Sequence, residues 1–266
     1  MLAAASFFDL TEFSHKALFH EAGYVWDGLV RLKSYMNGLD YSSFEHEELE
    51  NGIPLKNHLL YYRNSLQSGK GCSISWDDAG KGSLSVMREG QLLVGASVIM
   101  AGAVILGQKI RIGQGVLIES GALIKSPAVI DDYTEIRQGA YVRGYCLTGK
   151  RCVIGHCTEV KHSIFLNDAK AGHFAYLGDS ILGNDANLGA GTKFANLRFL
   201  PGNVQVRTEK GLLDTGLRKL GAILGDRVQT GCNSVTNPGT LIGQEGILMP
   251  NTTANSGFHT PSKIIR

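Results

Sequence analysis

One aliphatic residue recurs at every sixth position through the middle of the chain. Twelve of thirteen positions in this series carry an aliphatic side chain or methionine, and a small or β-branched residue follows four positions later. The series is Val94, Met100, Leu106, Ile112, Ile118, Ile124, Ile130, Ile136, Val142, Thr148, Ile154, Val160 and Leu166. Neither an amphipathic helix, with a period of 3.6, nor an alternating strand, with a period of 2, produces a period of six. The pattern is typical of a parallel β-helix, in which three six-residue rungs close one triangular coil.

We therefore predict an all-β protein, a left-handed parallel β-helix over residues 76–253 with the large aliphatic side chains on its axis. The period returns near the C-terminus, before a predicted tail at 254–266; its members there are Leu182, Leu188, Leu224, Thr230, Thr236, Ile242 and Leu248. Between these blocks, residues 196–221 alternate polar and apolar residues around Pro201-Gly202. This stretch predicts a hairpin that leaves the coil.

The chain before the repeat has a different pattern. Residues 17–36 carry apolar side chains at helical spacing, and Asp9 with Glu12 fits a helix-capping box. The helical positions are Val25, Trp26, Leu29, Val30 and Leu32. We predict that residues 1–75 form a helical and irregular cap over the open end of the β-helix.

Composition narrows the class of function. A net charge of +2, from 26 basic and 24 acidic residues without a dense Lys/Arg run, argues against a nucleic-acid surface. The first residues lack the basic start of a signal peptide, and no stretch is long and apolar enough for a membrane span, so we expect a cytoplasmic protein. The five cysteines form no C-x-x-C motif and are expected to be reduced, with Cys146 and Cys152 packed inside.

Basic residues stack on one face of the predicted coil. With eighteen residues per coil, Lys125, Arg143 and Lys161 form a column of outward side chains, whereas Arg137 lies on another face. Cations about 5 Å apart, the spacing of neighbouring strands, repel each other unless an anion lies among them. The column is therefore either a solvated charged face or a phosphate site, and the spacing alone leaves both open.

The period breaks directly after this column. Leu166 and Leu182 are 16 residues apart, which predicts a register slip within "NDAKAGHFAYLGDS" that moves the backbone outward beside the column. His173 lies in this segment, with Tyr176 three residues later. A histidine with an ordinary pKa of about 6.5 is a common general base. The alternative is a structural histidine.

Four stretches resemble a known family: "VRGYCLTGKRCVIGHCTEVK", "KAGHFAYLGDS", "ANLGAGTKFANLR" and "TGLRKLGAILGD". Over about residues 142–196 the chain resembles the acetyltransferase half of the bifunctional enzymes that make UDP-N-acetylglucosamine from glucosamine-1-phosphate. These enzymes are bacterial and archaeal, and the last two stretches are closer to the archaeal branch.

The resemblance implies an N-acetyltransferase that uses acetyl-CoA as co-substrate, acts on an amino-sugar-1-phosphate and needs no tightly bound metal. It implies a homotrimer with sites between neighbouring β-helices, and no nucleic-acid or membrane partner. Its implied roles are a general base at His173, phosphate contacts from Arg143, Lys161 and Tyr176, a sugar contact from Asn187, and acyl-CoA contacts from Ala190, Asn196 and Cys232.

Two alternatives remain beside the transferase. The chain has "NLRF" where bacterial members have N-Y-D-G, "LPGNVQV" where archaeal members carry lysines, and no L-x-G-G-x-G-T-R-M loop. The first two departures favour a non-catalytic trimeric scaffold or regulatory relative of sugar nucleotidyltransferases. The retained site residues oppose it, namely His173, Lys161, Arg143, Asn187 and Asn196. A zinc site of the carbonic anhydrase type needs three converging histidines. His156 and His162 lie on different faces of the predicted coil and His173 lies across the register slip, which argues against zinc.

Overall fold

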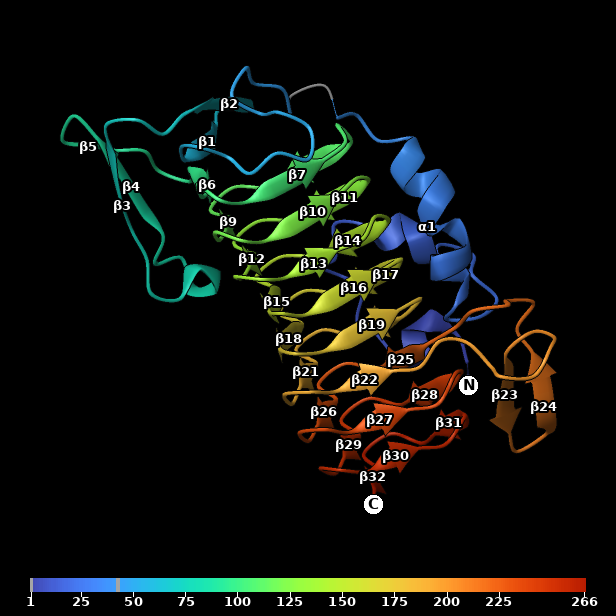
Figure 1. Ribbon diagram of the computed structural model, residues 1–266. Coiled ribbons are helices and arrows are strands. Elements are labelled where there is room, and N and C mark those ends of the chain that lie inside the picture. The colour runs from blue at the N-terminus through green and yellow to red at the C-terminus, as the bar shows by residue number, and fades with distance from the viewer. Residues whose placement is uncertain (1, 42–43) are drawn as a thin grey trace.

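The computed structural model describes residues 2–41 and 44–266, and it is a left-handed parallel β-helix with three flat sides (Figure 1). The predicted fold class is confirmed. The first side contains β6 (Ser97–Ile99), β9 (Leu117–Ile118), β12 (Glu135–Ile136), β15 (Val153–His156), β18 (Lys170–His173), β21 (Asn187–Leu188), β26 (Gln229–Thr230), β29 (Ile247–Leu248) and β32 (Ile264–Ile265).

The other two sides are built in the same way. The second side contains β7 (Val104–Leu106), β10 (Leu123–Lys125), β13 (Tyr141–Val142), β16 (Glu159–Lys161), β19 (Tyr176–Gly178), β22 (Lys193–Phe194), β27 (Val235–Thr236) and β30 (Thr253–Ala254). The third side contains β8 (Ile110–Ile112), β11 (Ala128–Ile130), β14 (Cys146–Thr148), β17 (Ser163–Phe165), β20 (Ile181–Leu182), β25 (Ala222–Leu224), β28 (Thr240–Ile242) and β31 (Gly257–His259).

The axis is filled by aliphatic side chains at every sixth position in the middle coils. From Ile112 to Ile136 these side chains are at most 3% exposed. The prediction is wrong at the start of the series, because the first coil has one residue more than eighteen: Ile99 pairs with Ile118, and Ile105 with Ile124. Ile99 and Ile105 therefore replace Met100 and Leu106 on the axis, while Val94 precedes the first coil and is 75% exposed.

The register slip exists, and it occurs at two corners. Val160 and Ile164 are four residues apart, as are Leu177 and Ile181, whereas the equivalent residues of the preceding coil, Val142 and Leu147, are five apart. The second of these corners, between β19 and β20, lies within the predicted segment, and the first lies before it.

The first corner shortens its coil by one residue. Thr148 pairs with Phe165, so this coil has seventeen residues, and the residue is lost at the corner around His162, between β16 and β17. Phe165 replaces Leu166 on the axis, and Leu166 is buried outside it. His173 consequently lies in β18, paired with His156 of β15, and not in an outward bulge.

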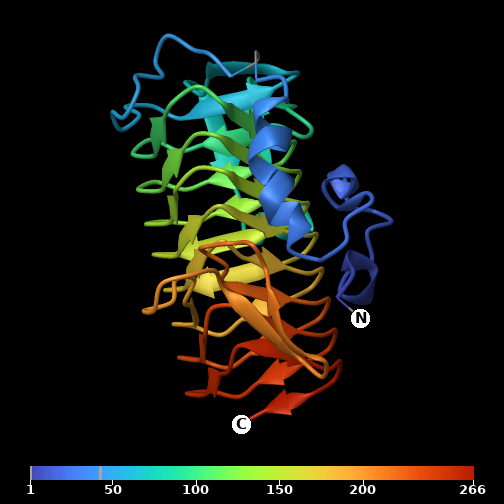
Figure 2. The same cartoon turned by 90° about the vertical axis from the view of Figure 1, so that its right-hand side faces the viewer.

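The N-terminal segment covers the third side. It contains η1 (Ala4–Ser6), η2 (Lys16–Phe19) and α1 (Asp27–Asn37), and Figure 2 shows α1 lying along the β-helix. Its apolar side chains pack on the outward residues of the third-side strands, among them Val129, Leu147, Ile164, Ile181, Ile223 and Leu241. The predicted capping box is wrong: the Asp9 amide instead donates to Asp226 at 2.7 Å, and the Asp9 carboxylate accepts from the Thr11 amide.

The N-terminal end of the β-helix is closed by a later part of the expected cap. There β1 (Leu59–Tyr62) pairs antiparallel with β6, and β2 (Ser65–Ser68) pairs with β1. Leu59 and Leu66 join the axial core. A ribbon of β3 (Cys72–Ser75), β4 (Ser85–Arg88) and β5 (Gln91–Leu92), with η3 (Ala79–Lys81), projects beside this end (Figure 1).

The coils run from Ser97 to Ile265. Residues 76–96 therefore belong to the ribbon and its connections, and 254–265 complete the last coil instead of forming a tail. The predicted hairpin is confirmed as β23 (Gln205–Thr208) and β24 (Gly211–Asp214), inserted between β22 and β25. The longest helix, α1, has 11 residues, and no helix in the described ranges could span a membrane.

Candidate functional site

Three predicted site residues stack at the corner between the first and second sides. The amide of Phe174 donates to the His156 carbonyl at 2.9 Å, Gly191 donates to His173 at 3.0 Å, and Asn233 donates to Ala190 at 2.8 Å. These backbone bonds place His156, His173, Ala190 and Cys232 on successive coils, and we call these four residues the corner column. The structure thus brings the predicted base together with two of the three predicted acyl-CoA contacts.

His173 is exposed at this corner. Its ring stacks on His156, with ring centres 5.6 Å apart and planes inclined by 24°, and lies 6.1 Å from the ring of Phe174, which is 59% exposed. The His156 neighbour was missed from the sequence, because eighteen-residue counting separates two histidines that a seventeen-residue coil stacks. The arrangement leaves an imidazole that a substrate can approach from solvent.

The other predicted residues, Asn187 aside, meet at the far edge of the second side. Lys161 lies 3.2 Å from the Asp179 carboxylate, His162 Nδ1 lies 2.9 Å from Asp179 Oδ1, and Asn196 Nδ2 donates to Oδ2 at 2.6 Å. We call Asp179 and these three partners the Asp179 cluster. Asp179 is 7% exposed, so its charge depends on these partners.

The basic column continues beside this cluster. Arg143 follows Val142 and Lys161 follows Val160, which are paired on neighbouring strands. The Arg143 guanidinium donates to Glu159 at 2.6 Å. The anions that relieve repulsion in the column are therefore carboxylates of the chain itself, a possibility that the sequence reasoning missed.

The surroundings of Asp179, Arg143 and Tyr176 shift the pKa of each side chain. Burial raises the pKa of Asp179, but hydrogen bonds from His162 and Asn196 and the charge of Lys161 outweigh it, so the pKa lies below its usual value. The hydrogen bond to Glu159 raises the pKa of Arg143. Burial, with the Glu159 and Asp179 charges, raises the pKa of Tyr176, which keeps its hydroxyl a hydrogen-bond donor.

The width of the second side separates the two groups. Tyr176 pairs with Glu159 and Gly178 with Lys161, so His173 lies five residues from the level of Lys161. At about 3.3 Å per residue this is roughly 16 Å along the chain. Asn187 is exposed on the first side, between Lys170 and Gln229, on the opposite flank of the corner column.

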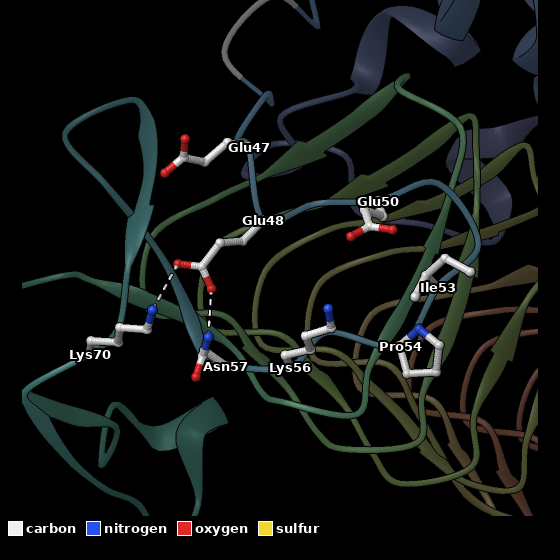
Figure 3. Close-up of a pocket in the computed structure, with 8 residues that line it drawn as sticks. All are labelled: Glu47, Glu48, Glu50, Ile53, Pro54, Lys56, Asn57 and Lys70. Atoms are coloured by element: carbon white, nitrogen blue, oxygen red, sulfur yellow. Dashed lines mark hydrogen bonds and ion pairs between the residues drawn. The ribbon is translucent and has the colours of Figure 1, made fainter.

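Two cavities lined by described residues lie away from both groups. Figure 3 shows one of about 380 Å³ near the N-terminal end, where Glu48 contacts Asn57 and Lys70. A larger cavity, of about 1160 Å³, lies beside the hairpin and β31. Neither is lined by a predicted site residue. Within the described ranges, no group of three or more His, Cys, Asp or Glu side chains is arranged to hold a metal ion.

A family model described as the GMPPB C-terminal domain matches residues 124–266. A Sulfurisphaera tokodaii protein named bifunctional sugar-1-phosphate nucleotidylyltransferase/acetyltransferase is 37% identical over 116 residues, which cover 44% of this chain and 29% of that protein. The bifunctional protein GlmU of Methanococcus maripaludis strain C5 is 36% identical over 127 residues, or 48% and 31% of the two chains. The matched region thus spans less than a third of either relative.

Solved structures resemble the chain more distantly. The Francisella novicida UDP-N-acetylglucosamine acyltransferase is 15% identical, with a TM-score of 0.36, over 62% of this chain and 65% of that one. A mutant of the GDP-perosamine N-acetyl transferase from Caulobacter crescentus, in complex with CoA and GDP-perosamine, is 19% identical, with a TM-score of 0.28, over 62% and 52%.

Proposed function

The chain belongs to the GMPPB C-terminal domain family, and on this premise we propose that it is an acyl-CoA-dependent N-acetyltransferase acting on an amino-sugar-1-phosphate. The observation that carries the proposal is the corner column, which stacks His173, Ala190 and Cys232 on successive coils with the His173 ring open to solvent. The names of the archaeal relatives, which include an acetyltransferase activity, support the same reaction class.

His173 is the general base of this proposal. The sugar ammonium gives a proton to the imidazole, and the amine nitrogen attacks the thioester carbonyl of acetyl-CoA. The carbon–sulfur bond then breaks, the acetyl group stays on nitrogen, and the CoA thiolate leaves as the thiol after taking a proton. Ala190, Asn196 and Cys232 lie along the acyl-CoA, and Asn187 contacts the sugar. General-base help of this kind typically contributes about 10²- to 10⁴-fold.

The sugar phosphate binds Arg143, Lys161 and Tyr176. Because Arg143 and Lys161 lie at the opposite edge of the second side from His173, one chain does not form a compact site. A homotrimer resolves this, since the basic edge of one β-helix can face the corner column of its neighbour. Support comes from apolar side chains exposed along the first and second sides and their corner, namely Ile247, Ile264, Tyr141 and Phe174. We place this homotrimer in the cytoplasm.

One observation favours the scaffold alternative. Arg143 and Lys161 are already paired with Glu159 and Asp179, so a phosphate must compete with carboxylates of the chain for both cations. A chain that keeps the β-helix and these internal pairs without binding a sugar phosphate would be a trimeric scaffold.

Thiol release separates the two functions. The full chain is mixed with acetyl-CoA and either glucosamine-1-phosphate or galactosamine-1-phosphate, and free CoA thiol is measured over time. The transferase releases thiol with at least one sugar and none without sugar. A chain that sediments as a trimer yet releases no thiol with either sugar is the scaffold.

A further inference from the structure

The larger of the two cavities described above contains none of the residues assigned to the site. It has a volume of about 1160 Å³ and lies between the β23–β24 hairpin, the turn after β31 and the start of the N-terminal segment. It opens beside the third side, away from the corner column. Its chemistry therefore needs a separate explanation.

Three cationic residues line this cavity, and none of them forms an ion pair within the described ranges. Arg207 and Lys210 come from the hairpin and Lys263 from the last coil. No residue within the described ranges forms a hydrogen bond or ion pair with their charged ends. Arg143 and Arg227, in contrast, are each bonded to a glutamate. The lining also includes Glu209, so cations exceed carboxylates by two, and the cavity favours a ligand with more than one negative charge.

The rest of the lining is aromatic, apolar or amide. Tyr24 is 39% exposed and stacks on Trp26 at 4.6 Å, with the planes inclined by 11°. Phe258 and Leu212 extend the apolar surface. Asn237 and Asn255 also line the cavity, and their side-chain amides have no hydrogen-bond partner among the described residues. Such a wall suits a planar ring whose edge carries both donors and acceptors.

The hairpin packs closely on the β-helix. Val204 and Val206 are fully buried, and β23 packs directly on Gly257, where an added Cβ would lie 2.9 Å from the Arg207 carbonyl oxygen. Gly257 also has a φ of +121°, which favours glycine. The backbone of the hairpin is thus packed against the β-helix before any ligand arrives.

We propose that this cavity binds a nucleoside diphosphate, with the pyrophosphate on Arg207, Lys210 and Lys263 and the base beside Tyr24 and the two asparagine amides. Binding there is independent of acetyl transfer, because no residue of the corner column or the Asp179 cluster takes part. The ligand would join the hairpin to the N-terminal segment.

Calorimetric titration of the full chain with ADP and with UDP tests the proposal. At least one nucleotide should bind, and Arg207→Ala with Lys210→Ala should weaken it by about tenfold per cation removed. Lys219→Ala, which removes a cation of the same insertion that does not line the cavity, is the matched control and should leave affinity unchanged. Tyr24→Leu should weaken the nucleotide while leaving inorganic pyrophosphate unaffected.

Three outcomes overturn the proposal. In the first, neither nucleotide binds the folded wild type. In the second, Lys219→Ala weakens nucleotide binding as much as the double variant does. In the third, CoA displaces the nucleotide, and the binding of CoA is lost in the double variant. The last result assigns the cavity to the acyl-CoA. The titration measures binding without turnover, so its result does not depend on the outcome of the thiol-release assay.

Discussion

The corner column and the Asp179 cluster place polar groups on the same scaffold in opposite ways. In the corner column, backbone hydrogen bonds between coils fix the residues, and the His173 ring is left exposed. In the Asp179 cluster, the side chains hold one another around a buried carboxylate. A residue positioned by its backbone can keep its side chain free for a substrate, whereas a residue positioned by its side chain is already engaged. Substitutions in the two regions should therefore affect different properties.

The largest expected effect is on turnover, at the corner column. His173→Ala should reduce acetyl transfer by about 10²- to 10⁴-fold with the melting temperature nearly unchanged, because the side chain is exposed and its backbone bonds remain. His156→Ala, one coil away in the same column, is the control and should retain most activity. Unfolding of the His173 variant would show instead that the corner is structural.

The next effect is on stability, at the Asp179 cluster. Asp179→Ala leaves Lys161 and His162 without their carboxylate and should cost about 3 kcal/mol of unfolding free energy, as expected for a broken buried pair. Denaturant unfolding measures this. Asp179→Asn should lose less because it keeps an oxygen for Asn196. An Asp179→Ala variant as stable as the wild type would contradict the assignment of Asp179 as the centre of the cluster.

The same carboxylate predicts a pH dependence. The pKa of Asp179 is lower in the folded chain than its usual value, so its contribution is complete above the unfolded pKa of about 3.9. It is lost as the pH falls through the lower, folded pKa. The difference in unfolding free energy between wild type and Asp179→Asn should shrink over that acid range, and a constant difference would argue against a depressed pKa.

A smaller effect separates the two interpretations of the basic column. Arg143→Ala or Lys161→Ala should raise the KM for an amino-sugar phosphate by roughly ten- to hundredfold, the value of one charge-assisted hydrogen bond, and raise it far less for the unphosphorylated sugar. Lys125→Ala, one coil away, should matter less. Equal losses with both sugars would identify the column as a solvated face.

The smallest effect is expected at Cys232. Its side chain is exposed at the corner and a serine is similar in size, so Cys232→Ser should change the KM for acetyl-CoA by less than about threefold and leave kcat unchanged. A larger change in kcat would place the thiol closer to the reacting atoms than the proposal does.

The fold was predictable because a period of six has few explanations. Ile112 to Ile136 follow it without interruption, and their burial confirms it. Counting failed where a coil has nineteen or seventeen residues, since one extra or missing corner residue changes which neighbour faces the axis. For this reason Leu106 and Leu166 were predicted on the axis, where the structure has Ile105 and Phe165.

The site was predictable only in part. The motif around His173 identified residues that the structure stacks with Ala190 and Cys232. Asp179, although it lies in the quoted "KAGHFAYLGDS", was missed, because a carboxylate in a corner has no periodic signal and its importance appears only when Lys161, His162 and Asn196 meet around it. The stacking of His156 on His173 could be predicted only by knowing that this coil has seventeen residues.

The N-terminal segment has a consequence for the order of folding. Each coil pairs with a neighbour made only some eighteen residues earlier, so the β-helix can assemble as it is synthesised. Asp9, in contrast, bonds to Asp226, a separation of 217 residues, and Phe7 packs against Phe258. Phe7 and Asp9 are therefore made long before their partners, and they remain without them until the distal coils exist. This segment can therefore dock fully only after the β-helix beneath it has formed.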